Sequence, residues 1–79
     1  MNLRRMIMIW TFVKSTTIRS VAYDEKNKDL YISFNHGAIY KYPFTPKSLY
    51  DGLLNAPSKG HYHGAYIKRR ECERVELYK

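Results

Sequence analysis

The chain has little of what would stabilise it by covalent links or anchor it in a membrane. Its 79 residues include a single cysteine, so no disulfide can form within it, and nothing indicates an oxidising compartment. The longest apolar run, residues 6–10, is far shorter than the roughly 20 residues of a membrane-spanning helix. We therefore expect a cytoplasmic protein without membrane contact.

Acidic residues are also scarce. Fourteen lysines and arginines stand against seven aspartates and glutamates, which gives a net charge of +7. Such an excess favours an acidic partner: a nucleic acid such as RNA, a nucleotide, or an anionic surface. The alternative is that the charge only keeps the protein in solution.

No pattern in the sequence indicates catalysis. None of the carboxylates lies in an apolar stretch, and Cys72 is flanked by Glu71 and Glu73, which disfavour its thiolate. His61 and His63 are two residues apart, but no third ligand follows at a spacing typical of zinc sites. We expect no enzyme activity, no catalytic residues, no metal and no cofactor. The roles of His63 and Cys72 stay open.

Aromatic residues are abundant. Eight tyrosines, three phenylalanines and one tryptophan can fill a dense core in a chain near the lower size limit for a single domain. Because association of copies would relieve that limit, we expect a homo-oligomer.

Three segments alternate like strands: residues 18–23, 30–34 and 38–42. In the second, Leu30, Ile32 and Phe34 share one face. The polar residues 24–29 form a turn, and residues 35–37 form a hairpin connection in which Gly37 can take a positive φ. This pattern predicts an antiparallel meander with one apolar face.

A short helix follows the meander. Pro43 ends the sheet, Thr45 is expected to be the N-cap and Pro46 the first helical residue. Ser58 is a candidate cap for a second short helix, which Gly60 and Gly64 interrupt. Residues 71–79 have the spacing of a final strand. The fold class is therefore α+β: a small antiparallel sheet, with edge strands from both ends of the chain, packed by one or two short helices.

The N-terminal segment is apolar, and residues 6–13 contain Trp10 and Phe12. We expect residues 1–12 to form either an edge strand or an interface arm. If the arm docks on another protein, the chain is a protein-interaction or inhibitor module, which is the alternative function.

Two segments have the chemistry of phosphate contacts. One places Lys14 beside hydroxyl residues, although it could equally be a polar bend between strands; the other, residues 58–70, contains no acid. Within residues 58–61, glycine lets backbone N–H groups approach an anion, while the alternative is a capped turn between helices. Nearby tyrosines offer faces for stacking bases. The candidate ligand-binding residues are Lys14, Ser15, Thr16, Lys59, Gly60, His61, Tyr62, Tyr66, Lys68, Arg69 and Arg70.

Taken together, the motifs resemble the KTSC domain. They are Val13-x-Ser15-Thr16-x-Ile18, Tyr40-x-Tyr42, Pro46-x-x-Leu49-Tyr50 and Ser58-x-Gly60-x-Tyr62. The resemblance spans residues 13–70, and we expect residues 13–79 to form the domain.

That resemblance implies a small α+β domain without established enzyme activity. The family is named for its occurrence at the C-terminus of some lysyl-tRNA synthetases, which suggests contact with RNA by analogy. Free-standing members occur in bacteria and phages, and they suggest a phage-type protein that sequesters a signalling nucleotide.

Overall fold

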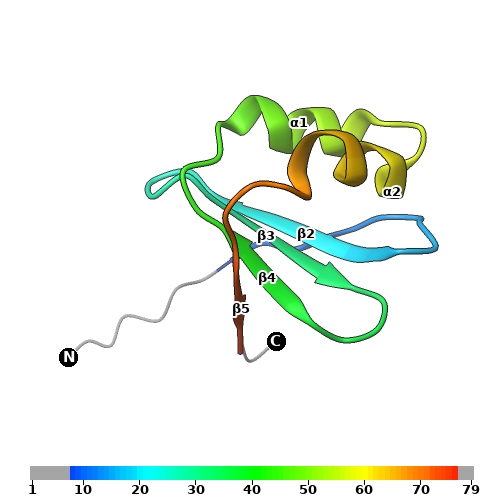
Figure 1. Cartoon of the computed structure of the whole chain (residues 1–79), viewed down its shortest axis with the longest axis horizontal. Coiled ribbons are helices and arrows are strands. Elements are labelled where there is room, and N and C mark those ends of the chain that lie inside the picture. The colour runs from blue at the N-terminus through cyan, green and yellow to red at the C-terminus, as the bar shows by residue number, and fades with distance from the viewer. Residues whose placement is uncertain (1–7, 77–79) are drawn as a thin grey trace.

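The computed structural model describes residues 8–76 as a sheet covered on one face by helices (Figure 1). Its elements, in chain order, are β1 (Thr11–Phe12), β2 (Ile18–Asp24), β3 (Asp29–Phe34), β4 (Ile39–Tyr42), α1 (Lys47–Asn55), α2 (Lys59–Tyr62), the π-helix η1 (His63–Ile67) and β5 (Glu73–Val75). The sheet is antiparallel, and its strands lie in chain order from β1 to β5. The predicted α+β class is confirmed.

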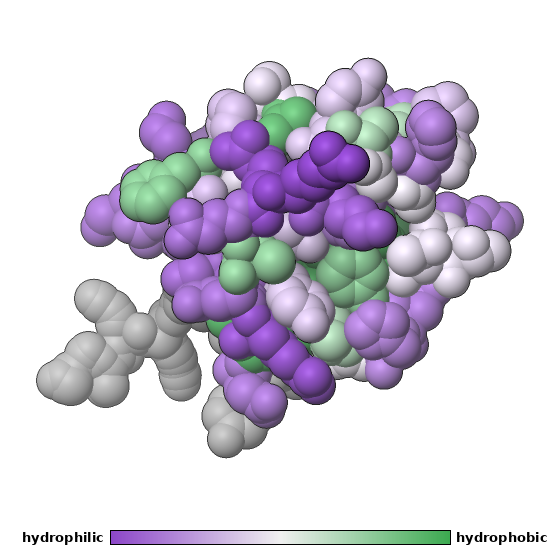
Figure 2. Space-filling view, in the orientation of Figure 1, coloured by the Kyte–Doolittle hydropathy of each residue, from purple (hydrophilic) through white to green (hydrophobic). Residues whose placement is uncertain are grey.

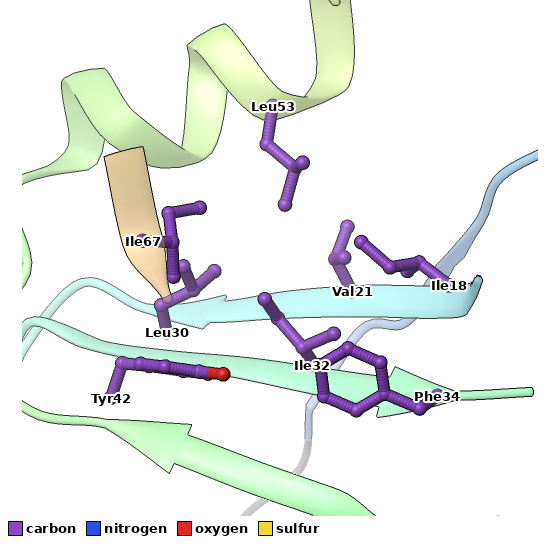
Figure 3. Close-up of a cluster of buried hydrophobic side chains, with 8 residues drawn as sticks. All are labelled: Ile18, Val21, Leu30, Ile32, Phe34, Tyr42, Leu53 and Ile67. Carbon is purple, nitrogen blue, oxygen red and sulfur yellow. The ribbon is translucent and has the colours of Figure 1, made fainter. Parts of the chain in front are cut away.

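The core lies between the sheet and the helices (Figure 3). Leu30 and Ile32 of β3 are fully buried, as are Leu53 of α1 and Ile67 of η1. The alternation predicted for the meander holds, because Ile32 pairs with Tyr40 and Leu30 with Tyr42 across β3 and β4. Gly37 takes a φ of +109° in the β3–β4 hairpin, as expected.

The opposite face of the sheet is more buried than the alternation predicts. Ser20, Ala22 and Ser33 are almost fully buried there. The ring of Trp10 meets Tyr31 edge-on, with the ring centroids 6.4 Å apart. The segment before β1 thus covers part of this face.

Both ends of the chain supply the predicted edge strands. In β1, Thr11 pairs with Val21 and Phe12 with Ser20, so this part of the N-terminal segment is an edge strand. At the other edge, β5 pairs with β4 and the Lys41 ammonium lies 3.2 Å from the Glu73 carboxylate. The first seven residues of the proposed arm, and residues 77–79 of the predicted final strand, lie outside the described residues.

The start of α1 differs from the prediction. Pro46 is the N-cap, and Thr45 makes no cap. The Thr45 hydroxyl instead donates to the carbonyls of Tyr42 and Pro43, at 2.9 and 3.2 Å. Thr45 therefore fixes the turn that leaves the sheet, and the helix begins one residue later than expected.

The second helix was predicted correctly at its start and wrongly afterwards. Ser58 caps it, because its hydroxyl accepts from the backbone N–H of His61. Neither Gly60 nor Gly64 interrupts it, since the helical path continues from α2 into the π-helix η1. Packing on the sheet outweighs the weak helix propensity of these glycines. Among residues 8–76, no helix is long and apolar enough to cross a membrane.

Gly52 of α1 is required by a close approach between the two helices. A Cβ at this position would overlap the Tyr62 hydroxyl and lie 2.7 Å from Tyr62 Cζ. Any side chain there would force the Tyr62 ring to move, and this contact accounts for a glycine in a helix interior that otherwise disfavours it.

Candidate anion-binding site

Two segments far apart in the sequence line one open pocket of about 370 Å³. The segments are residues 14–17, between β1 and β2, and residues 57–61, between α1 and α2; both lie at the right-hand end of the molecule in Figure 1. The lining has two lysines, one histidine and four hydroxyl side chains, and no carboxylate is among its described residues. Its composition suits an anion rather than an apolar ligand.

The first segment is held by its own hydrogen bonds. The Ser15 hydroxyl accepts from the backbone N–H groups of Thr17 and Ile18, at 3.0 and 3.1 Å. Asn35, from the β3–β4 hairpin, donates to the Ser15 carbonyl at 3.0 Å. Ser15 therefore shapes the loop and still has its own proton to donate. Lys14 is exposed and makes no ion pair or hydrogen bond through its side chain with the described residues.

The second segment has a lysine that is already engaged. Lys59 Nζ donates to the carbonyl oxygens of Leu54 and Ala56, at 3.0 and 2.6 Å. These carbonyls belong to the C-terminal end of α1, where the helix leaves acceptors unpaired and favours a positive charge. An ammonium group has three donors, so one N–H of Lys59 remains.

A direct contact joins the two segments. A Cβ built on Gly60 would lie 3.1 Å from Thr17 Oγ1 and 3.5 Å from Thr17 Cβ. Gly60 thus lets the α2 turn pack closely on the β1–β2 loop, and the pocket forms beside this contact.

The structure divides the predicted binding residues into separate groups. Lys14, Ser15 and Thr16 lie in the pocket together with Lys59, Gly60 and His61. Three residues line the same pocket but were not among the predicted binding residues: Thr17, Pro57 and Ser58. Ser58 could have been found from its place in the Ser-x-Gly motif, whereas no sequence signal marks Pro57.

The two candidate tyrosines differ in exposure. Tyr62 is half-buried and packs against the core, so its ring is largely used by the fold. Tyr66 is 60% exposed, and its ring lies 4.8 Å from that of Tyr62. Tyr66 is therefore the better stacking face of the pair.

The remaining basic residues lie at the other end of the helical layer. Lys68 and Arg69 are exposed in the turn after η1, and Arg70 Nη2 donates to the Phe44 carbonyl at 2.7 Å. Figure 2 shows strongly hydrophilic side chains along the near face, over the segment after η1 and along β5. The acid-free stretch of the sequence is thus split between two ends of the fold.

His63 belongs to the core side of η1 and not to the pocket. Its ring meets the Phe34 ring edge-on at 5.2 Å, and its Nε2 lies 3.0 Å from the Tyr42 hydroxyl. Burial, and secondarily Lys68, lowers the pKa of His63. Burial raises the pKa of Tyr42 to about 12. Both shifts favour the uncharged forms, so this hydrogen bond joins a neutral phenol and a neutral imidazole, and the imidazole tautomer sets which of them donates.

The other metal and thiol candidates are dispersed in the described part of the chain. His61 is in the pocket, whereas His63 contacts Tyr42, and no group of three or more His, Cys, Asp or Glu residues among residues 8–76 is arranged to hold a metal ion. Cys72 is exposed and lines a smaller hollow of about 150 Å³ together with Lys41, Pro43, Glu71 and Glu73.

Comparisons with known proteins agree with this architecture. The chain is 36% identical over 55 residues to a lysine–tRNA ligase of Nostoc punctiforme, and the match covers 70% of the chain but 10% of the ligase. It is 32% identical over 56 residues to a protein without assigned function from Stutzerimonas stutzeri, covering 71% of the chain and 79% of that protein.

A solved structure is similar as well. The crystal structure of a KTSC domain protein from Yersinia pestis matches with a TM-score of 0.82 and 30% identity, over 89% of this chain and all of the other. The family model of the KTSC domain matches residues 14–70, from the first lysine of the pocket to the arginine that contacts Phe44. This chain belongs to the KTSC domain family.

Proposed function

We propose that the protein binds a phosphate-bearing ligand, a nucleotide or RNA, in the pocket between residues 14–17 and 57–61. One observation carries the proposal: two segments that are distant in the sequence bring lysines and hydroxyls, and no acid, to one pocket. Hydroxyl and ammonium groups are the usual donors to phosphate oxygens.

Binding without catalysis is the function that this lining supports best. General acid–base chemistry needs paired titratable groups, and His61 is the only such candidate among the described lining residues apart from the two lysines. A nucleotide or RNA partner also agrees with the net charge of +7 and with the cytoplasmic location expected from the single cysteine.

The Nostoc relative is a lysine–tRNA ligase, which supports an RNA ligand by analogy alone, because the chain spans only 10% of that protein. A small signalling nucleotide held by a phage-type protein is the other form of the proposal. The two forms differ in salt dependence. Binding to a polymer weakens steeply as salt rises, whereas a small nucleotide releases few counterions.

A titration tests the proposal directly. Labelled short RNA and a panel of mono-, di- and cyclic nucleotides are added to the protein at two salt concentrations, and binding is followed by anisotropy and calorimetry. We expect binding at low salt that Lys14→Glu weakens. Lys26→Glu is a matched control, since it makes the same charge change in the β2–β3 turn, away from the pocket. Absence of binding to every probe at low salt would refute the proposal.

The exposed N-terminal segment favours a second candidate function. Ile9, just before β1, is 81% exposed and Phe12, in β1, is 69% exposed, so two large apolar side chains at this edge of the sheet face solvent. They suit docking on another protein or on another copy of the chain. Replacing both with serine keeps the backbone of β1 and tests this role: a change in oligomeric state or in partner binding would support it, and unchanged behaviour would count against it.

A further inference from the structure

Phe44, between β4 and α1, combines an unfavourable backbone conformation with a highly exposed side chain. Its φ is +51°, in the left-handed region that residues with a Cβ rarely adopt. Its side chain is 79% exposed, so the ring contributes little burial in return. Glycine or asparagine would suit this backbone better. Strained residues of this kind are often found where a protein meets a ligand.

The neighbouring residues hold Phe44 in place from both sides. Thr45 is fully buried, and its N–H donates to the Lys28 carbonyl at 2.8 Å while its own carbonyl accepts from the Tyr23 hydroxyl at 2.5 Å. Arg70 donates to the carbonyl of Phe44 itself at 2.7 Å. The ring is therefore presented to solvent on a fixed backbone, and little order would be lost when a partner binds.

The segment that contacts Phe44 is mostly basic. Arg70 bonds to the Phe44 carbonyl, and Lys68 and Arg69 precede it; both are exposed, and their side chains make no ion pair with the described residues. Glu71 follows Arg70 in the chain. Three residues after Phe44, Lys47 pairs with Glu25 and Asp51, so the surface at the start of α1 is mixed in charge. An exposed ring whose backbone is bonded to a basic segment suits a nucleobase together with the phosphate attached to it.

The ring is separated from the pocket by the length of a helix. Helix α1 begins three residues after Phe44 and ends at Asn55, two residues before the lining residue Pro57. Nine residues of helix span roughly 13 Å. Tyr66, which is 60% exposed, lies in η1, between the pocket residue His61 and Lys68 in the chain. Two contact points at this separation suit several linked nucleotides better than a single one.

We propose that Phe44, with Lys68 and Arg69, is the base-stacking end of a site for single-stranded RNA whose other end is the phosphate pocket. This inference rests on the proposed function and narrows its ligand from any phosphate compound to an oligonucleotide. One base stacks on the Phe44 ring, the adjacent phosphate pairs with Lys68 or Arg69, and a phosphate further along the strand enters the pocket.

Binding of hexaadenylate and of AMP to four variants tests this inference. Phe44→Gly is expected to weaken hexaadenylate binding about tenfold, which is the loss of one stacked base, and to leave AMP binding unchanged. The same change should raise the Tm by about 5 °C, because glycine relieves the backbone. Phe44→Tyr should retain hexaadenylate binding. Phe12→Ala removes another exposed ring, in β1, and should change neither affinity, while Lys14→Glu should weaken both.

The possible results separate the two proposals. If Lys14→Glu weakens binding but Phe44→Gly does not, the stacking role is wrong and the phosphate pocket stands. If the wild-type protein binds neither AMP nor hexaadenylate, both fail. If Phe44→Gly instead dissociates an oligomer in sedimentation and leaves RNA binding unchanged, the ring contacts another copy and the RNA assignment is overturned.

Discussion

The two ends of the helical layer resemble each other: at each end, one basic side chain is bonded to a backbone carbonyl and others are exposed. At the pocket, the Lys59 ammonium donates to the carbonyls at the end of α1, while the Lys14 side chain has no such partner among residues 8–76. At the Phe44 end, Arg70 donates to the Phe44 carbonyl, while Lys68 and Arg69 form no hydrogen bond or ion pair through their side chains with the part of the chain that the structure describes. Each end thus uses one cation for structure and leaves others for a ligand. A count of charges along the sequence cannot make this distinction, because it depends on which carbonyls lie nearby.

The largest loss of stability should come from a steric clash between the two helices at Gly52. Gly52→Ala adds a methyl group where Tyr62 already lies, so we expect a loss of about 1–3 kcal/mol in the free energy of unfolding, although alanine favours helices. Chemical denaturation measures it. Gly64→Ala is the control, because a Cβ there meets nothing within 4 Å. Equal effects at the two glycines would show that helix propensity and not the Tyr62 contact decides.

The comparison of free and engaged lysines predicts opposite phenotypes. Lys59→Met removes two charge-assisted hydrogen bonds from the end of α1 and should lower the free energy of unfolding by about 1–2 kcal/mol. Lys14→Met should leave stability unchanged. Thermal and urea unfolding measure both variants. If Lys14→Met proved the more destabilising, the assignment of Lys59 as the structural lysine would be wrong.

Ligand affinity, unlike stability, should depend on Lys14. Lys14→Glu replaces a free cation of the pocket with an anion, and it should weaken nucleotide or RNA binding about tenfold and reduce the salt dependence of RNA binding by about one ion. Titrations at several salt concentrations measure both quantities. Lys26→Glu should match the wild type; an equal loss in this variant would mean that net charge alone governs binding.

The smallest effect concerns pH and His63. Because the pKa of His63 is lowered in the folded protein, the unfolded chain binds its proton more readily. The His63 contribution to stability should therefore be complete above the usual histidine pKa of 6.5 and decline as pH falls below it. A Tm series from pH 5 to 8 measures this decline. His63→Phe should flatten the slope, and His61→Asn should retain it; an unchanged slope in His63→Phe would assign the effect to another group.

Much of the fold could be predicted because alternation and turn chemistry are local signals. The meander, the hairpin at Gly37 and the cap at Ser58 all follow from neighbouring residues. The helix start at Pro46 was misplaced because the Thr45 hydroxyl finds carbonyl acceptors in the preceding turn rather than the helix N-terminus. The continuation of α2 into η1 was missed since tertiary packing overrides the propensity of Gly60 and Gly64.

The candidate site was only partly visible in the sequence. Residue chemistry identified Lys14 and Gly60 separately, but only the fold shows that their segments meet at Thr17. Phe44 gave no signal at all. An aromatic residue between two prolines is typical of a loop, and its positive φ is held by long-range hydrogen bonds, from Thr45 to Lys28 and from Arg70 to the Phe44 carbonyl.

The contact between Thr17 and Gly60 makes the pocket a product of tertiary docking and not of either segment alone. Neither segment forms a lining alone, so the pocket exists only when the β1–β2 loop and the helical layer have docked. A molecule that fills the pocket binds only the state in which the loop and the helices are docked. By mass action it must raise the free energy of unfolding of the whole domain. The ligand would then link the sheet to its helical layer reversibly. Amide hydrogen exchange in both layers would slow together when the ligand is bound.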